Sequence, residues 1–434
     1  MKGNKVRYNF GKQGTFMIAY SALLVYFMTG LTVDALNVIV PGFAALKGWD
    51  ADQLLSIATP ASIIALILTS FWGVAIKKFG LKKSTTIALF ASGVSIFLFA
   101  KSANILMYGI METLMITFIN CFSVIGGYAM IANWFPKKKG IVLGFTTMGM
   151  NLASATIPGL ITFFSKIIDK NGNITHALMV FAVIFILVGI FNTIFIKVTP
   201  EEAGLLPDNE PLVDNIDVSK ESIKDKAKGF SYWQVLKMPN IWKMGLAYGF
   251  AGMGTVGIMS QLIPYLVGNR GFNQSQAILT MSVAALIGIL GSYLWGVIDQ
   301  KWGTKLASQY FGIWYALGIA FLIAPFGKVT LYIGIFIIGI GIGGTGNFPP
   351  SMTTLCYGRA YFPIAFSVVN MIMGVIRSAA FVVLGVVRGA TSSTEAAYIV
   401  FLVLSILSTV TISFVKDWNQ ETEEDSYRGT SLNP

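Results

Sequence analysis

The sequence predicts an all-α membrane protein with twelve transmembrane helices in two six-helix halves. Three observations predict this fold class: the composition, a series of long apolar runs and one internal repeat. Of the 434 residues, 55% are hydrophobic and only 12% are charged, whereas a soluble chain carries about 25% charged residues. This deficit excludes a soluble enzyme, a disordered chain and a nucleic-acid binder, so we expect no nucleic-acid partner.

The apolar runs locate the expected helices. A transmembrane helix needs about 20 mostly apolar residues, and twelve runs of this kind occur in the chain. We number them as spans one to twelve, and they lie at 16–43, 53–76, 84–100, 105–131, 140–164, 176–196, 242–266, 275–298, 306–326, 329–355, 363–387 and 395–415.

One long polar stretch divides the chain into two halves. The expected domains are an N-terminal half (1–196), a cytoplasmic linker (197–240), a C-terminal half (241–415) and a cytoplasmic tail (416–434). The linker mixes Lys with Asp and Glu, which predicts a solvated tether. Its last part alternates aromatic and polar residues before Pro239, which predicts a short interfacial helix.

The distribution of Lys and Arg predicts the orientation, because these residues are enriched in cytoplasmic loops. With the N-terminus inside, the short inner segments hold fourteen Lys and Arg, and the outer loops hold seven. Both termini are therefore expected in the cytoplasm. The net charge of +11 is then mostly a signal of topology in a multi-pass protein of the plasma membrane, or of a bacterial inner membrane.

No pattern points to catalysis or to a metal. The two cysteines, Cys121 and Cys356, lie in different halves, and the only histidine is His176. A metal site of the usual Cys/His type needs several such residues at short spacing. We expect no metal, no cofactor and no enzymatic activity. The glycines of 341–346 match a dinucleotide fingerprint, but no strand precedes them, so we interpret them as close helix packing.

The loops after spans two and eight repeat each other. Trp72–Lys82 and Trp295–Lys305 share Trp, Gly, Val, Lys, an aromatic residue, Gly and Lys in register, 223 residues apart. Two halves related by a parallel repeat indicate one class of secondary transporters. We expect these loops to take part in gating, through Gly73, Lys77, Lys78, Gly80, Lys82, Gly296, Gln300, Lys301, Gly303 and Lys305.

The spacing Gly-x4-basic-x-Gly-x-basic in both loops resembles the inner-loop signature of the major facilitator superfamily. The resemblance covers the whole twelve-span plan. It implies transport by alternating access, with spans three, six, nine and twelve facing lipid and the others lining a cavity. The family usually has Asp four residues after the first Gly, where this chain has Lys77 and Gln300. This departure puts the usual latch of the N-terminal half in doubt.

Two shorter stretches resemble the oxalate/formate antiporter family and its monocarboxylate-porter relatives. They are 133–140 (NWFPKKKG) and 199–205 (TPEEAGL). That family holds its dicarboxylate with basic residues in helices eight and eleven. Span eight of this chain contains no Lys or Arg, which argues against oxalate and favours a substrate with one carboxylate.

Three charged side chains fall within spans, namely Asp34, Glu112 and Arg377. A charge at the bilayer centre costs at least about 2.5–3.5 kcal/mol, so each is expected to face a cavity or a partner. Arg377 lies near the middle of span eleven, and a guanidinium binds a carboxylate through two parallel hydrogen bonds. We expect Arg377 to bind the substrate carboxylate. Asp34 or Glu112 would take up a coupling proton or pair with Arg377.

Further polar residues could complete the pocket, although ordinary interhelical hydrogen bonds explain them equally well. Asp34 shares a helix face with Tyr26, and Arg377 shares one with Asn370. The full set of expected substrate-binding residues is Arg377, Asn370, Tyr26, Asn120, Asn151, Tyr248 and Gln261.

These patterns predict a monomeric secondary transporter for a small organic monocarboxylate, coupled to protons or working by exchange. Two alternatives stay within transport. The substrate could be a larger amphipathic anion, such as a bile salt, or an uncharged solute if Arg377 is only a structural partner of the internal acids. A channel or a membrane enzyme is disfavoured, because the spans contain no nucleophile–base constellation and the halves repeat as a rocking carrier requires.

Overall fold

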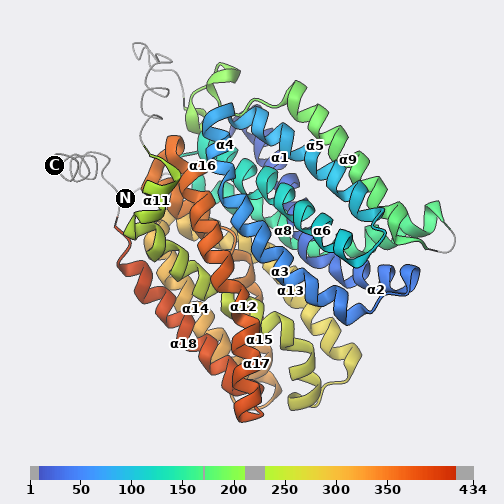
Figure 1. The fold of residues 1–434 in the computed structure, drawn as a ribbon. Coiled ribbons are helices and arrows are strands. Elements are labelled where there is room, and N and C mark those ends of the chain that lie inside the picture. Colours follow the sequence, from blue (N-terminus) through green and yellow to red (C-terminus); the bar gives the residue numbers. More distant parts are fainter. Residues whose placement is uncertain (1–8, 170–171, 211–229, 417–434) are drawn as a thin grey trace, which may run out of the picture.

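The computed structural model describes residues 9–169, 172–210 and 230–416, and the regular structure of these ranges is helical. Figure 1 shows the N-terminal half (blue to green) beside the C-terminal half (yellow to red), with their helices side by side. Helices are the expected form of the apolar runs, because backbone polar groups in lipid must bond within their own segment.

The six spans of the N-terminal half are built from one to three helical segments each. Spans one and four contain π-helical segments, η1 and η2, which are frequent at functional sites, and Asp34 is the last residue of η1. In chain order the segments are α1 Gly11–Thr29, η1 Gly30–Asp34, α2 Leu36–Lys47, α3 Ala51–Ser70, α4 Trp72–Phe79, α5 Leu81–Ala100, α6 Ile105–Asn120, η2 Cys121–Gly127, α7 Tyr128–Trp134, α8 Lys139–Ile168 and α9 Ile174–Phe195.

The C-terminal half follows two short 3-10 helices, η3 Glu201–Ala203 and η4 Pro207–Asn209. Its helices are α11 Tyr232–Lys237, α12 Pro239–Arg270, α13 Gln274–Trp302, α14 Thr304–Ile323, α15 Lys328–Gly344, α16 Phe348–Ser378, α17 Ala380–Thr391 and α18 Thr394–Ser413.

Eleven helical stretches of the described chain are long and apolar enough to cross a membrane. One of them, Lys328–Thr391, contains 64 residues and is too long for one crossing. Within it, Gly358 breaks α16 with φ 61° and ψ −179°. This break separates span ten from span eleven, so the described residues contain twelve candidate crossings.

Both ends of the described chain lie at one end of the helix bundle. Lys138 Nζ donates to the carbonyl of Asn9, and Asn240 exchanges two hydrogen bonds with the backbone of Lys416. Lys305 Nζ likewise donates to the carbonyl of Val415. We call this end the terminal face and the opposite end the far face. The expected tail falls almost wholly on 417–434, outside the described residues.

Five even-numbered spans begin at the far face with a side-chain cap. An oxygen of the preceding Asp, Asn or Ser accepts a hydrogen bond from a backbone N–H of the first turn, which satisfies a donor that has no intrahelical partner. The capping residues are Asp50, Asn104, Asn173, Asn273 and Ser393.

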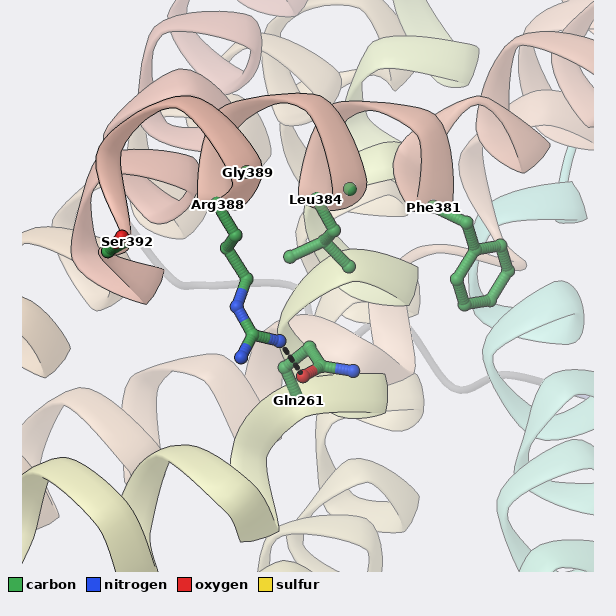
Figure 2. A pocket seen from close by; sticks show the side chains of 7 residues that line it. Gln261, Phe381, Leu384, Arg388, Gly389 and Ser392 are labelled. Atoms are coloured by element: carbon green, nitrogen blue, oxygen red, sulfur yellow. Dashed lines mark hydrogen bonds between the residues drawn. The ribbon is translucent and has the colours of Figure 1, made fainter.

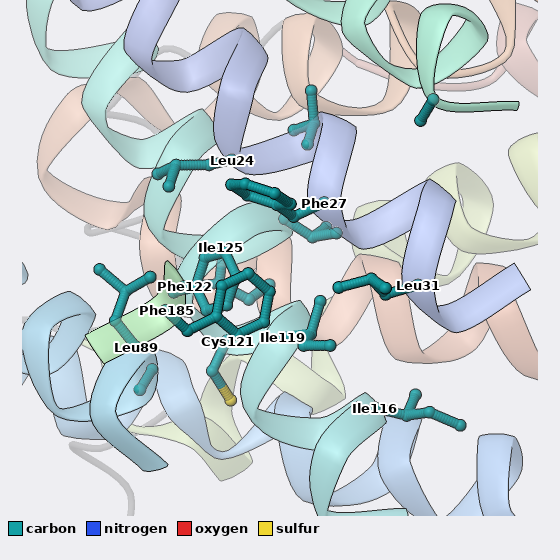
Figure 3. Packing of buried hydrophobic residues seen from close by; sticks show 14 of the residues in the cluster. Leu24, Phe27, Leu31, Leu89, Ile116, Ile119, Cys121, Phe122, Ile125 and Phe185 are labelled. Atoms are coloured by element: carbon teal, nitrogen blue, oxygen red, sulfur yellow. The ribbon is translucent and has the colours of Figure 1, made fainter. Parts of the chain in front are cut away.

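Each half has its own hydrophobic cluster, and the N-terminal cluster also takes in Phe362 and Phe366 of α16. Figure 3 shows its centre, where Phe27, Phe122 and Phe185 bring spans one, four and six together. The ring centroids of Phe27 and Phe122 lie 5.0 and 5.2 Å from that of Phe185, in edge-on contacts that suit the aromatic quadrupole.

The two halves meet through particular helices. α8 packs along α13, and α16 packs on α3 and α4. α5 packs on α9 at one edge of Figure 1, and α14 packs on α18 at the other. Spans three, six, nine and twelve therefore occupy the periphery, as the superfamily resemblance implies.

The internal repeat is present in the backbone. Gly80 (φ 85°, ψ 154°) and Gly303 (φ 86°, ψ 149°) each join two helices with the same turn, in a region of φ that only glycine adopts without strain. Pro41 in α2 and Pro264 in α12 are also 223 residues apart, and each lies inside a helix. The repeat thus relates both loops and helices.

Candidate functional site

Arg377 has a free cationic group. Its side chain is exposed, and it has no hydrogen-bond or ion-pair partner within the part of the chain that the structure describes. Its aliphatic stem lies on Gly252 of α12, where an added Cβ would come within 3.0 Å of Arg377 Cδ. The stem is therefore positioned by packing, while the guanidinium remains available to a ligand.

The face of α16 that carries Arg377 is directed toward the N-terminal half. Gly374, three residues earlier, packs on Leu66 of α3, so that an added Cβ would lie 2.7 Å from Leu66 Cδ1. Asn370 is two turns from Arg377 on the same face; it is buried and makes no side-chain hydrogen bond with described residues. Arg377 and Asn370 thus share one face of α16.

Asp34 is half-buried and faces span five. Ser154 Oγ of α8 donates a 2.8 Å hydrogen bond to Asp34 Oδ2. Tyr26 and Thr156 share a second 2.8 Å bond between the same two spans. Neither acid within the spans lies within 4 Å of a basic group among the described residues. The expected internal ion pair with Arg377 is therefore not formed in this conformation.

Ser154 and Arg377 occupy equivalent positions, because 223 residues separate them. The same offset relates other contacts of α8 and α16: Gly73 meets Pro363 and Ser367, whereas Gly296 meets Gly140 and Gly144. One repeat position thus carries a hydroxyl bonded to an acid in the N-terminal half, and in the C-terminal half a cation without an ion-pair partner among the described residues.

Glu112 does not line an open cavity. Its side chain is 0% exposed, and neither carboxyl oxygen has a hydrogen-bond partner among the described residues. Tyr108 lies one turn earlier and packs against Phe43, Trp49 and Phe99. The expectation that Glu112 faces a cavity or a partner is wrong for this conformation, because the fold encloses it within the N-terminal half without a hydrogen-bond partner among the described residues.

The other predicted pocket residues do not converge. Asn120 Nδ2 donates to Ile116 O in its own helix. Asn151 Nδ2 donates to Gly288 O and Ser292 Oγ of α13. Tyr248 shares a hydrogen bond with Ser308 of the peripheral α14. Gln261 lies near the far face, where it accepts from Arg388. Except for Gln261, these residues form ordinary helix contacts rather than a common pocket.

The two halves are in close contact at the terminal face. A Cβ added at Gly73 would lie 2.6 Å from the Cα of Ile364 in α16. A Cβ added at Gly296 would lie 2.8 Å from the Cα of Gly144 in α8. Such contacts require glycine, because any side chain would separate the helices. This end of the molecule is therefore closed.

An ion pair also joins the halves at this face. Arg359, just after the Gly358 break, donates from both Nη atoms to the two carboxyl oxygens of Glu201, each at 2.8 Å. Burial alone would raise the pKa of Glu201, but the hydrogen bonds and charge of Arg359 outweigh it and hold this pKa below its ordinary value. The pair is only 21% and 25% exposed, so water screens it less than a surface pair.

The two stretches 133–140 and 197–210 form one structure. Trp134 Nε1 donates to Lys197 O, and Asn133 Nδ2 donates to Val198 O. The buried carboxylate of Asp208 accepts from the backbone N–H groups of Lys137 and Lys138. The expectation of a solvated tether is therefore wrong for 197–210, where these bonds hold the chain against span four. Residues 211–229 lie outside the described residues.

α11 lies between span two and span eleven. Tyr232 stacks on Phe71 with ring centroids 4.7 Å apart and shares a 2.9 Å hydrogen bond with Ser70. Lys77 Nζ donates to Phe230 O. Lys77 stands where the family usually has an acid. Its hydrogen bond to Phe230 O links the N-terminal loop to the start of the C-terminal half. Lys78 Nζ lies over the ring of Phe79.

Sequence reasoning missed Asp299 and selected Gln300. Gln300 Nε2 donates to Lys137 O, but Asp299 is the buried acid of the C-terminal loop. Its Oδ1 accepts from Thr304 Oγ1, and its carboxyl carbon would lie 2.9 Å from a Cβ at Gly140, beside the start of α8. A carboxylate is favourable at a helix N-terminus. The one-residue offset from the family pattern concealed this position.

A pocket of about 630 Å³ lies between α12 and α17 near the far face. Figure 2 shows Arg388 reaching from α17 toward Gln261 of α12, with Leu384 and Phe381 farther along the same helix. The remaining lining residues are Gly385, Gly389 and Ser392. Sequence reasoning did not select Arg388, which directly follows the predicted end of span eleven.

Comparison with known proteins identifies the fold and the family. The sequence pattern of the Major Facilitator Superfamily matches residues 22–381. The proton:xylose symporter XylE superposes with a TM-score of 0.73 at 13% identity, over 93% of this chain and 96% of that one. The human organic anion transporter MFSD10 gives 0.65 at 12% identity, over 91% and 97%.

Two curated relatives are similar in sequence. The oxalate:formate antiporter of Oxalobacter formigenes is 24% identical over 232 residues, which is 52% of this chain and 50% of that protein. The MFS-type transporter YhjX of Escherichia coli K12 is 20% identical over 303 residues, 69% of this chain and 70% of its own length. The chain thus spans about half the length of the first relative.

Proposed function

We propose that this chain, which belongs to the Major Facilitator Superfamily and is a secondary transporter, carries a small organic monocarboxylate bound by Arg377. The observation that carries the proposal is the unpaired guanidinium of Arg377 on the helix face directed toward the other half. A cation at this depth in a membrane is costly unless it meets an anion or water. A carboxylate would satisfy it with two parallel hydrogen bonds.

A substrate with one carboxylate matches the number of deep cationic side chains, because Arg377 is the one placed within a span. α13 contains no Lys or Arg before Lys301, at its terminal-face end. Asn370, whose amide makes no hydrogen bond with the described residues, lies two turns away and can donate to a second polar group of the solute. The similarity to a protein named for oxalate and formate supports an anionic carboxylate substrate, and the single deep Arg377 favours one carboxylate over two.

Asp34 is the better candidate for a coupling proton. It is half-buried in a π-helical segment and bonded to Ser154, whereas Glu112 is fully enclosed. Asp34 keeps partial exposure, so a proton entering with the solute can reach it, and its charge would then change beside the interface of spans one and five. Substrate exchange without protons is the alternative mode.

Transport by alternating access would require the closed terminal face to open while the far face closes. Opening the terminal face requires separation of Gly73 and Gly296 from their partner helices and loss of the Glu201–Arg359 pair. The excess of Lys and Arg in the terminal-face loops supports a cytoplasmic location of this face. In the present conformation the solute would then enter from the far face, outside the cell.

The test compares acids with their amides in proteoliposomes. We would measure uptake of radiolabelled formate, acetate and benzoate, and competition by each acid and its amide, in wild type, Arg377→Lys, Arg377→Gln and the charge-matched control Lys328→Gln. We expect acids alone to compete, and Arg377→Gln to weaken acid binding at least about 30-fold, the equivalent of about 2 kcal/mol. Arg377→Lys keeps the charge but loses the two-pronged bond, so its loss should be smaller.

Two results would contradict the proposal. Equal competition by acid and amide would make the solute neutral and Arg377 structural. Unchanged acid binding by well-folded Arg377→Gln protein would place the substrate elsewhere. Thermal unfolding of each purified variant separates loss of binding from loss of fold.

A further inference from the structure

The helix face that carries Arg377 continues to the far face and ends at a second arginine. Phe381, Leu384 and Arg388 follow Arg377 by 4, 7 and 11 residues, the spacing of one side of a helix. The break at Ala379 is small, because its φ of −66° and ψ of −7° are close to helical values. At 1.5 Å per residue, Arg388 lies about 16 Å nearer the far face than Arg377.

Arg388 has no ion-pair partner within 4 Å among the described residues, and Glu395, which follows the pocket, accepts hydrogen bonds from Asn269 and Ser393 instead. Arg388 Nη1 donates a 2.8 Å hydrogen bond to Gln261 Oε1, which is a neutral partner. None of the seven lining residues is acidic. The buried Leu384 and the exposed ring of Phe381 provide an apolar wall beside the guanidinium. Cβ atoms added at Gly385 and Gly389 would meet nothing within 4 Å, so the space beside Arg388 is open.

We propose that this pocket is a second anion site, which receives organic carboxylates with an apolar body before they move along span eleven to Arg377. This inference rests on the proposed function. In the pocket a carboxylate replaces Gln261 Oε1 as the acceptor for Arg388, and the Gln261 amide donates to its second oxygen. The apolar body lies against Phe381 and Leu384, where its burial contributes hydrophobic free energy.

The two arginines then differ in what they select. Arg377 recognises the carboxylate alone, whereas the Arg388 pocket also selects the body of the solute. Formate has no apolar body and gains only the charge attraction, while benzoate also covers Phe381. The outer pocket therefore favours aromatic or branched acids, and it raises the local concentration of anions above the deeper site.

The experiment uses a cysteine as a probe of charge within the pocket. In Gly385→Cys protein in nanodiscs, we would compare the labelling rates of an anionic methanethiosulfonate (sulfonatoethyl) and a cationic one (trimethylammonioethyl), each divided by its rate with free thiol. The native Cys121 and Cys356 are buried, and unmodified protein gives their background. The arms are Gly385→Cys alone and combined with Arg388→Gln, with Arg377→Gln, or with Lys328→Gln, which removes an exposed cation outside the pocket.

We expect the anionic reagent to be preferred, and Arg388→Gln to lower that preference about tenfold, as expected for one unit charge a few ångströms from a solvated pocket. Lys328→Gln should leave it unchanged. Added 4-fluorobenzoate should slow labelling and 4-fluorobenzamide should not, and this protection should disappear with Arg388→Gln but persist with Arg377→Gln.

An unchanged charge preference in Arg388→Gln would overturn the proposal. So would protection that persists in Arg388→Gln and is lost in Arg377→Gln, because the acid would then bind only at the deep arginine and carboxylate transport would stand without an outer site. If the outer protection is seen but Arg377→Gln transports acids normally, the outer site stands and the role of Arg377 fails.

Discussion

At one position of the repeat, the two halves have opposite chemistry. In the N-terminal half Ser154 uses its hydroxyl to bond Asp34, so the polar groups of spans one and five satisfy each other. In the C-terminal half the equivalent Arg377 lies over Gly252 and has no partner among the described residues. A repeat that is symmetric in backbone is thus asymmetric in charge, with the acid in one half and the cation in the other.

The loops at the terminal face are more alike. Gly73 and Gly296 make the same close contact with the opposite half, and Gly80 and Gly303 make the same turn. The charged residues of the two loops differ. The C-terminal loop has Asp299 beside the start of α8, whereas the N-terminal loop has Lys77, whose Nζ donates to Phe230 O. The glycine contacts that close the terminal face are the same in both halves, whereas the groups proposed to bind solute differ between them.

The largest expected effect on acid binding comes from removing the side-chain group at the repeated position in the C-terminal half. Arg377→Gln should weaken acid binding at least about 30-fold, whereas Ser154→Ala removes one hydrogen bond and should weaken it less than about tenfold, since such a bond contributes about 1 kcal/mol. Binding isotherms of benzoate to both purified variants make the comparison. Equal losses would mean that the halves contribute alike.

The next effect concerns the acid of the pair. Asp34→Asn keeps an oxygen that can accept from Ser154 but cannot carry a proton. We therefore expect pH-driven accumulation of acid to be lost and exchange of acid for acid to be retained. Glu112→Gln is the matched control, since Glu112 is enclosed. Accumulation that survives Asp34→Asn and fails in Glu112→Gln would reverse our choice of acid.

A smaller effect is expected at the close glycine contacts. Gly73→Ala and Gly296→Ala should each disfavour the closed terminal face by about 1–3 kcal/mol, the usual cost of an added methyl group in a packed interface. Gly159→Ala is the control, because a Cβ there meets nothing within 4 Å. Spin-label distances across the terminal face report the shift. A change confined to one of the two glycines would show that the loops are not equivalent.

The smallest effect belongs to the ion pair of Glu201 and Arg359. A double-mutant cycle with Glu201→Gln and Arg359→Gln should give about 1 kcal/mol of coupling, as for a partly exposed pair. Because the pKa of Glu201 is held below its ordinary value, the stabilisation is fully present above the ordinary glutamate range. It is lost only as the pH falls through the lowered pKa. The spin-label populations measured against pH test this sign, and a loss of closure near neutral pH would contradict it.

The organisation of the helices could be predicted from the sequence because hydrophobicity is local. The twelve runs became twelve crossings, with ends displaced by a few residues where polar ends extend the helices, as at Trp134 and Trp302. The repeat of Gly80 and Gly303 could be detected in the sequence because a positive φ favours glycine. That preference does not depend on the position of the neighbouring helices. The π segments η1 and η2 left no such signal.

The fold class, the family and the three charges within the spans could be read from the amino-acid sequence, because composition and apolar length decide which segments a membrane accepts. The pairing of polar groups became visible only in the folded chain. It enclosed Glu112, joined Asp34 to Ser154, turned Tyr248 toward α14 and paired Glu201 with Arg359. Such contacts depend on the rotation of each helix about its axis and on residues far apart in the chain, and no local pattern records either.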